Sequence, residues 1–307
     1  MKSLKIVSRT SPLALWQAEQ VKAKLLLLNP LLTIEIIGIK TIGDQLLDVS
    51  LAKIGGKGLF VSALEDALLK NEADIAVHSM KDLPAILDPA FTIAAILERE
   101  DARDVLVSHD NKNLNELPEH AIVGTSSLRR QSQLLALRSD LSVSPLRGNV
   151  ETSLAKLKDK QYEAIILAAA GLKRLNLQHH IQQYFEPTEM LPAIAQGALA
   201  IECCLDNLAI REQLQALHHL PTAACVLAER ALSESLGGSC TLPLAGLATF
   251  TTAHTLTLTG KISSPDGTRV ITSTASGPSN NPVALGQSVA KNLFAGGATE
   301  IIALCTS

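Results

Sequence analysis

Short apolar segments of strand length alternate with helical segments through most of this chain. Residues 4–8, 33–39 and 74–77 have the length and aliphatic content of buried strands. The helix predicted at 13–28 begins after Ser11 and Pro12, because serine caps helices and proline is favoured in their first turn. A further helix is predicted at 59–70. This alternation predicts an α/β fold.

The pattern begins again at residue 122. A strand at 122–123 runs into hydroxyl-bearing residues and a helix at 128–138, much as the strand at 4–8 runs into Arg9, Thr10 and Ser11. We therefore expect two similar α/β domains facing one cleft, although two copies of a common helix-capping pattern would give the same short similarity. The second domain continues with strands at 142–146 and 164–168 and a helix at 150–158.

The sequence changes character after Pro221. A helix is predicted at 223–236, and strict alternation at 255–259 indicates a strand with one buried face. A turn at 264–267, a strand at 270–274, a helix at 283–294 and a strand at 300–304 follow. These elements predict a small α+β domain, so the chain is expected to have three domains, which suits its 307 residues.

Composition excludes several classes of protein. Apolar residues make up 47% of the chain and charged residues 19%, which argues against disorder. A net charge of −3 and only 3% aromatic residues disfavour nucleic acid or an anionic membrane surface as partner. The five cysteines form no C-x-x-C pair, so neither a disulfide framework nor a metal site is indicated. We see no signal peptide or membrane helix and expect a cytoplasmic protein.

Cationic residues follow several predicted strands. Residues 125–130 place two hydroxyl side chains and the guanidinium groups of Arg129 and Arg130 at a helix N-terminus, which is suited to bind anions. Ligands bind at the carboxyl ends of strands in open α/β sheets. Any one arginine alone could equally be ordinary surface charge, but the repetition predicts a polyanion site. The other cations in such positions are Arg9 (with Ser11), Arg147 and Arg174.

Three further residues could carry chemistry. Asp82 follows the strand at 74–77, where a catalytic carboxylate could be presented, although a turn aspartate would look the same. Cys240 lies in a Gly-Ser-Cys loop, where a thiol could serve as attachment point or nucleophile, but no histidine is adjacent to activate it. Lys57 lies in Gly-Gly-Lys-Gly, which lacks P-loop spacing and indicates a lid.

Taken together, these segments resemble the porphobilinogen deaminase family, also called hydroxymethylbilane synthase. The matching segments occur in the family's order almost from end to end of the chain. They are residues 9–16, 53–60, 74–82, 98–101, 124–130, 147–150, 171–174 and 196–198, together with the loop around Cys240.

The resemblance implies a transferase of haem and porphyrin biosynthesis. Two domains like periplasmic binding proteins would surround a cleft, and a dipyrromethane cofactor would be joined by a thioether to Cys240. Four porphobilinogen molecules would be condensed on this primer with loss of ammonia, and hydrolysis would release hydroxymethylbilane. The domains implied are 1–97 with 198–216, then 103–191, then 220–307, in a monomer.

The resemblance also assigns roles to individual residues. Asp82 would be the catalytic carboxylate, and Lys53 and Lys57 would belong to a lid. The family usually has arginine where this chain has Ser153, so one carboxylate contact is expected to be lost or taken over. The residues that match cofactor-binding and substrate-binding positions are Arg9, Ser11, Lys81, Thr125, Ser127, Arg129, Arg130, Arg147, Gly148, Arg174 and Gln196.

Two alternatives from other classes share some of these features. A binding protein that captures an anionic small molecule would have the same fold and arginines, but it would not need the Gly-Ser-Cys loop. A regulatory ligand sensor would need a DNA-binding helix pair with a basic face, which the sequence does not show. The ordered motifs favour the enzyme.

Overall fold

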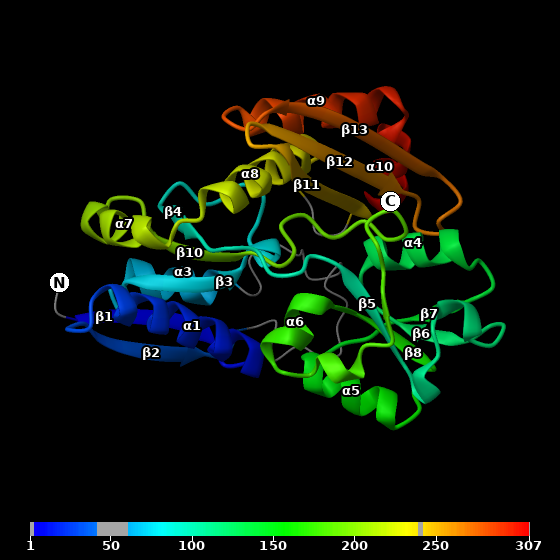
Figure 1. Ribbon diagram of the computed structural model, residues 1–307, viewed down its shortest axis with the longest axis horizontal. Coiled ribbons are helices and arrows are strands. Elements are labelled where there is room, and N and C mark those ends of the chain that lie inside the picture. Colours follow the sequence, from blue (N-terminus) through cyan, green and yellow to red (C-terminus); the bar gives the residue numbers. More distant parts are fainter. Residues whose placement is uncertain (1–2, 42–60, 239–241, 307) are drawn as a thin grey trace. The chain divides into compact units, whose positions relative to one another are not determined.

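The computed structural model describes residues 3–41, 61–238 and 242–306. The contacts between residues divide the chain into two compact units. Unit 1 comprises residues 1–100 and 197–223, and unit 2 comprises residues 101–196 and 224–307. The chain therefore leaves the first unit after Glu100 and returns to it at Gly197. The returning segment is visible in Figure 1 as the yellow-green strand labelled β10.

Unit 1 contains a five-stranded sheet in the order β2-β1-β3-β10-β4. The first three strands are parallel, and β10 runs antiparallel to both of its neighbours. Along β1 the apolar side chains alternate between the two faces. Leu4 and Ile6 pack with α1 and α7, whereas Val7 packs with α3. The strands are β1 (Ser3–Arg9), β2 (Thr33–Ile39), β3 (Ile75–Ser79), β4 (Phe91–Ile96) and β10 (Leu199–Cys204), and the helices are α1 (Pro12–Leu28), α3 (Ser62–Leu69) and α7 (Leu208–Leu214).

Unit 2 contains a second five-stranded sheet in the order β7-β6-β8-β5-β9. Strands β7, β6 and β8 are parallel, and β5 runs antiparallel to β8 and β9. Helix α4 covers one face through Leu134, whereas α5 and α6 cover the other through Leu157 and Leu172. The strands are β5 (Asp104–Ser108), β6 (Ile122–Gly124), β7 (Ser142–Ser144), β8 (Ala164–Ala168) and β9 (Gln183–Tyr184), and the helices are α4 (Leu128–Leu137), α5 (Val150–Lys158) and α6 (Ala169–Arg174).

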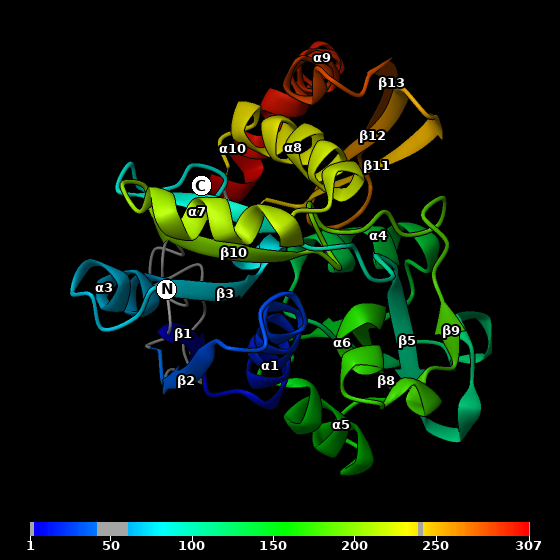
Figure 2. The ribbon, with the colours of Figure 1, turned by 60° about the vertical axis from the view of Figure 1, so that its left-hand side comes forward.

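A three-stranded antiparallel sheet, β11-β12-β13, forms the C-terminal part of the chain. Three helices, α8, α9 and α10, share a buried apolar cluster with one face of it (Figure 2). The opposite face carries hydroxyl side chains, and Thr257 and Thr259 bond across to Ser276 and Thr274. The bounds are β11 (Leu244–Thr252), β12 (Thr255–Ser263), β13 (Val270–Pro278), α8 (Leu220–Ser235), α9 (Pro282–Ala295) and α10 (Ala298–Thr306).

The structure confirms the predicted α/β class with an α+β C-terminal part, but one predicted element is wrong. Residues 300–304 form part of helix α10, not a strand. A short apolar run fits either state, and Ile301 and Cys305, spaced by one helical turn, both pack against the neighbouring apolar cluster. Strands β4, β5, β9, β10 and β11 and helices α6 and α7 were not predicted.

Within these described residues, no helix is both long enough and apolar enough to span a bilayer.

Candidate functional site

Two parallel neighbours in unit 1, β1 and β3, end at the same edge of the sheet. Arg9 is the last residue of β1. After β3 the chain makes a single 3₁₀ turn, η2 (Met80–Asp82), whose backbone is held by a hydrogen bond of 3.0 Å from the Met80 amide to the Ala198 carbonyl. The predicted position of Asp82 just beyond a strand end is therefore confirmed, and Lys81 precedes it in the same turn.

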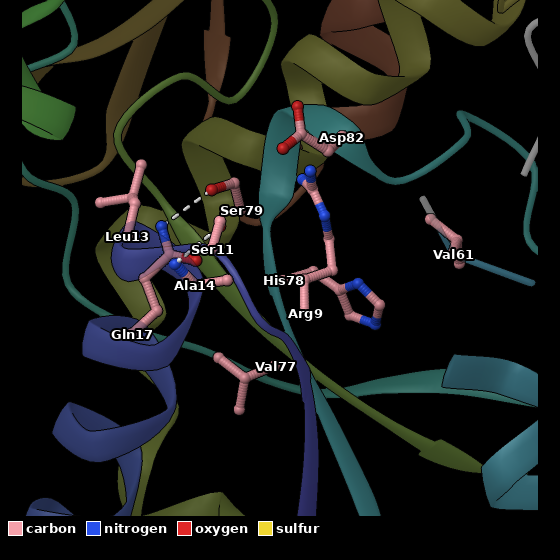
Figure 3. A pocket seen from close by; sticks show the side chains of 10 residues that line it. All are labelled: Arg9, Ser11, Leu13, Ala14, Gln17, Val61, Val77, His78, Ser79 and Asp82. Carbon is pink, nitrogen blue, oxygen red and sulfur yellow. Dashed lines mark hydrogen bonds between the residues drawn. The ribbon is translucent and has the colours of Figure 1, made fainter. Parts of the chain in front are cut away.

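Arg9, Ser11 and Asp82 line one pocket in unit 1, and in Figure 3 the Arg9 side chain extends toward Asp82. Ser11 also caps α1, since its Oγ accepts a hydrogen bond of 3.3 Å from the Ala14 amide. The other residues that line the pocket are Leu13, Ala14, Gln17, Val61, Val77, His78 and Ser79.

The sequence analysis missed Gln17 and Ser79 as pocket residues. The side-chain amide nitrogen of Gln17 donates a hydrogen bond of 2.9 Å to Ser79 Oγ. Figure 3 draws this bond as a dashed line between the two residues. Gln17 lies one helical turn after Leu13 on the inner face of α1, so its helical spacing from Ser11-Pro12 could have placed it there. Ser79 is the last residue of β3. Its position at the end of a strand could have identified it, as the same position relative to the strand identified Asp82.

A buried acid–base pair lies on the strands beside this pocket. His78 Nε2 is 2.9 Å from Glu202 Oε2, and Glu202 Oε1 has no hydrogen-bond partner among the residues that the structure describes. On α3, burial and the nearby charge of Glu202 raise the pKa of Glu65 to about 7. The pocket and the residues packed behind it thus combine carboxyl groups, a histidine and the cation Arg9, a set that can bind an anion and transfer protons.

The equivalent edge of unit 2 is formed by β6, β7 and β8, which are parallel neighbours. Thr125 directly follows β6, and Ser127 caps α4 by accepting a hydrogen bond of 3.4 Å from the Arg130 amide. Arg147 follows β7, and α6 begins where β8 ends. The structure therefore places these predicted residues at the strand ends, as expected, except Arg174, which lies at the far end of α6.

Arg129 and Arg130 share a buried carboxylate that the sequence analysis did not identify. Arg129 Nη1 donates to Asp104 Oδ2 at 2.7 Å, and Arg130 donates through Nε and Nη2 to Asp104 Oδ1 at 3.0 and 2.8 Å. The predicted residue Gln196 joins them, since its Nε2 donates to the same Oδ1 at 3.0 Å. No local spacing signals this contact, because Asp104 lies on β5, about 25 residues before the arginines.

The environment of this cluster is strongly charged. Burial alone would raise the pKa of Asp104, but the charges of Arg129 and Arg130 hold it well below its usual range. Burial lowers the pKa of Arg129, an effect that Asp104 opposes and Arg130 reinforces. A carboxylate and two guanidinium groups therefore lie together away from water, in a setting where an added anion is attracted strongly.

The segment after β7 shows why Gly148 is suited to its position. Its φ of +120° is rare for other residues, and a side chain there would clash with Thr152 at 2.6 Å. Asn149 then caps α5 by accepting a hydrogen bond of 2.8 Å from the Thr152 amide. Ser153 is buried, and its hydroxyl donates to the Asn149 carbonyl at 2.9 Å. The hydroxyl of Ser153 is thus engaged within its own helix.

Three predicted site residues, Cys240, Lys53 and Lys57, lie outside the described residues.

Comparisons with known proteins agree over nearly the whole chain. Residues 4–212 match the family model described as porphobilinogen deaminase, dipyrromethane cofactor binding domain, and residues 223–295 match that of the C-terminal domain of the same enzyme. The porphobilinogen deaminase of Chromobacterium violaceum is 53% identical over 303 residues, which are 99% of this chain and 98% of that protein. That of Nitrosomonas europaea is 54% identical over 302 residues, 98% of each chain.

Among solved structures, the periplasmic VFT2 domain of BvgS from Bordetella pertussis is similar over 69% of this chain and 85% of that one, with 14% identity and a TM-score of 0.41. The periplasmic aliphatic sulphonate binding protein SsuA of Escherichia coli is similar over 78% of this chain and 72% of that one, with 14% identity and a TM-score of 0.39.

The family matches first define a class, a transferase with a dipyrromethane-binding domain. More particularly, the chain belongs to the porphobilinogen deaminase family. The predicted family, enzyme class and cofactor are therefore confirmed.

Proposed function

We propose that this chain condenses four porphobilinogen molecules head to tail with loss of ammonia and then releases hydroxymethylbilane by hydrolysis. The sequence is 53% and 54% identical, over nearly its whole length, to two proteins named porphobilinogen deaminase, and this similarity supports the reaction. The observation that carries it is the pocket in unit 1, where a carboxylate, Asp82, and a cation, Arg9, occur together. Porphobilinogen carries both acidic side chains and an amine that must depart, so it needs both kinds of group.

Asp82 is the group we assign to the chemistry. Departure of ammonia leaves positive charge on the pyrrole of the substrate, and a carboxylate at the pocket lining lowers the energy of that charge as it develops. The same carboxylate can accept a hydrogen bond from a pyrrole N–H and assist proton transfer. The exposed position of Asp82 at the end of η2 leaves it accessible to substrate.

The other predicted residues hold acidic side chains. Guanidinium groups bind carboxylates in bidentate geometry, and helix N-termini add amide donors. Arg9 and Ser11 would do this in unit 1, and Thr125, Ser127, Arg129, Arg130 and Arg147 in unit 2. Arg174 and Lys81 would contribute further cationic groups. Gln196 is buried and bonds to Asp104, so we assign it to holding the arginine pair.

The donor set fits a dipyrromethane cofactor, because such a group carries carboxylates for the arginines and pyrrole N–H groups for Asp82. When bound, the cofactor supplies the pyrrole carbon to which the first substrate is joined. We propose Cys240 as its attachment point, and Lys53 and Lys57 as residues of a lid. These three assignments are supported by the matching motifs of the family.

We also propose three domains with the boundaries predicted from the sequence. The support is that each of the three sheets has an apolar cluster of its own. A cytoplasmic monomer that uses neither nucleic acid nor membrane completes the proposal. The net charge of −3 supports the absence of nucleic acid as partner.

The test is the stoichiometry of turnover. Purified protein is incubated with porphobilinogen, and both ammonia and hydroxymethylbilane are measured over time. We expect about four ammonia molecules for each hydroxymethylbilane, the ratio that the condensation requires. Binding of porphobilinogen without release of ammonia would overturn the proposal and would favour a binding protein.

A further inference from the structure

The arginine pair of unit 2 is not electrically balanced by the protein groups that contact it. Asp104 is fully buried and Arg129 is 5% exposed, so water screens this cluster poorly. Two guanidinium groups carry two positive charges, whereas Asp104 supplies one negative charge. A buried charge is strongly disfavoured unless it is paired. The cluster therefore needs one more negative charge.

The hydrogen bonds of the cluster leave two donors of one guanidinium unused by the described residues. Within the described part of the chain, both side-chain hydrogen bonds of Arg129 use Nη1, which donates to Asp104 and to the Leu191 carbonyl at 2.9 Å. Among the described residues, none accepts a hydrogen bond from Arg129 Nε or Nη2. Neither nitrogen is among the fully buried polar atoms that lack a partner. The Nε–Nη2 edge of a guanidinium is a two-donor fork that matches one carboxylate.

Arg130 has less capacity for a ligand. Its Nε and Nη2 both donate to Asp104, and its Nη1 donates to the Ile166 carbonyl at 2.9 Å. The fork of Arg130 that corresponds to the open edge of Arg129 is thus already used by the protein. The unused Nε–Nη2 edge of Arg129 can bind one carboxylate, and the net charge of the cluster would be neutralised by one carboxylate.

We propose that Asp104 is a positioning residue that holds both arginines and limits their net charge so that the pair accepts one carboxylate group. The proposal rests on the proposed function for the nature of the carboxylate, an acidic side chain of porphobilinogen or of the cofactor. Asp104 itself does not touch the ligand. It acts by fixing the planes of the two guanidinium groups and by cancelling one of their charges.

The experiment separates charge from position with two variants. Asp104→Asn removes the charge at nearly constant volume, and Asp104→Glu keeps the charge but moves it by one methylene group. The control is Asp140→Asn, because Asp140 is a partly exposed aspartate that pairs with a single arginine, Arg138, at the other end of α4. Each protein, as purified, is titrated with sodium sulfate, and a parallel titration with sodium chloride of equal ionic strength serves as the salt control. The Kd for sulfate is calculated from the rise in Tm that sulfate causes beyond that of chloride.

We expect Asp104→Asn to bind sulfate at least fivefold more tightly than the unchanged protein, because a second positive charge is left without a partner. Its KM for porphobilinogen should rise at least fivefold, since the guanidinium planes are no longer held. Asp104→Glu should raise KM while its sulfate Kd stays within twofold. Asp140→Asn should change neither quantity.

A sulfate Kd of Asp104→Asn within twofold of the unchanged protein would overturn the proposal, because a merely structural role predicts no gain in anion binding. If Asp104→Asn does not fold, Asp104→Glu decides, and an unchanged KM in that variant would overturn the positioning role. Failure of the proposed function would be seen separately, as absence of ammonia release by the unchanged protein, since the sulfate titration requires no turnover.

Discussion

The two five-stranded sheets have equivalent strand orders but carry different chemistry. In each, three parallel strands are followed by an antiparallel fourth strand, β10 in unit 1 and β5 in unit 2. Each antiparallel strand carries a fully buried carboxylate, Glu202 or Asp104. Glu202 bonds to a histidine, whereas Asp104 bonds to two arginines.

That difference shows how one architecture can serve two tasks. Arginine remains charged under all ordinary conditions, so the unit 2 cluster of two arginines and one carboxylate carries a fixed net positive charge. Unit 1 instead presents Asp82, an accessible carboxylate, in a pocket that also contains His78 and Arg9. We infer that unit 1 performs the proton and charge chemistry and that unit 2 holds acidic side chains.

The largest expected effect tests the chemical role of unit 1. Asp82→Glu moves the carboxylate by one methylene group, and we expect kcat to fall about 100-fold, because small displacements of a reacting group are costly. Asp88→Glu is the control, since Asp88 is an exposed aspartate of the same unit. A kcat for Asp82→Glu close to that of the control would remove Asp82 from the chemistry.

The next effect tests the binding role of unit 2. Arg130→Lys keeps the charge but loses the planar fork that bonds to Asp104, and we expect the KM for porphobilinogen to rise about tenfold with a smaller change in kcat. Arg138→Lys, on the same helix, should leave KM unchanged. If Arg130→Lys lowered kcat while leaving KM unaltered, the division of tasks between the units would be wrong.

A smaller effect tests whether the two helix starts are equivalent. Ser11 caps α1 and Ser127 caps α4 through the same type of hydrogen bond. Replacement of either serine by alanine should cost about 1 kcal/mol, which corresponds to a fall in Tm of about 2–4 °C. Thermal unfolding of both variants measures this, and a loss at only one cap would show that the likeness of the two starts is superficial.

The smallest effect concerns pH. The pKa of Glu65 is about 7 in the folded state against 4.5 ordinarily, so the folded state holds a proton that the unfolded state loses, and stability falls as pH rises between these values. Because Glu65 is partly exposed, solvent screens the penalty, and Glu65→Gln should raise Tm by only about 2 °C at pH 8. At pH 4.5 the variant should gain almost nothing.

Asp66→Asn is the control for this pH effect, because it removes a charge from the neighbouring exposed position of α3. Equal gains at both pH values for Glu65→Gln would mean that the substitution acts through packing or helix propensity. A carboxyl group of unit 2 shows the opposite shift. Hydrogen bonds and charge from Arg103 and Lys173 outweigh the effect of burial and lower the pKa of Asp101 to about 2.

Local signals were sufficient for much of the fold. The helix at α1 was predicted because Ser11 and Pro12 mark its start, and β12 because its polar and apolar residues alternate, which corresponds to partly buried and buried positions. The strand ends that carry Arg9 and Asp82 could be found in the same way. Such features depend on residues close together in the sequence, where capping and periodicity act.

Long-range contacts could not be predicted in this way. Strand β10 pairs with β3 across about 120 residues, and Asp104 meets its arginines only after the sheet has formed. The terminal helix α10 was misassigned because the short apolar run at 300–304 fits a strand or a helix, and only the tertiary structure shows that it pairs with none of the described strands. The family resemblance identified Gln196, but its bond to Asp104 required the structure.

The most direct test of the proposed function is the intact mass of the purified protein under denaturing conditions, before and after limiting porphobilinogen. We predict an excess of two linked pyrrole units on Cys240 that grows in steps of one pyrrole. Protein isolated without cofactor should gain the same excess after incubation with hydroxymethylbilane. A polypeptide mass that neither reagent changes would contradict the proposed reaction and the role of Cys240.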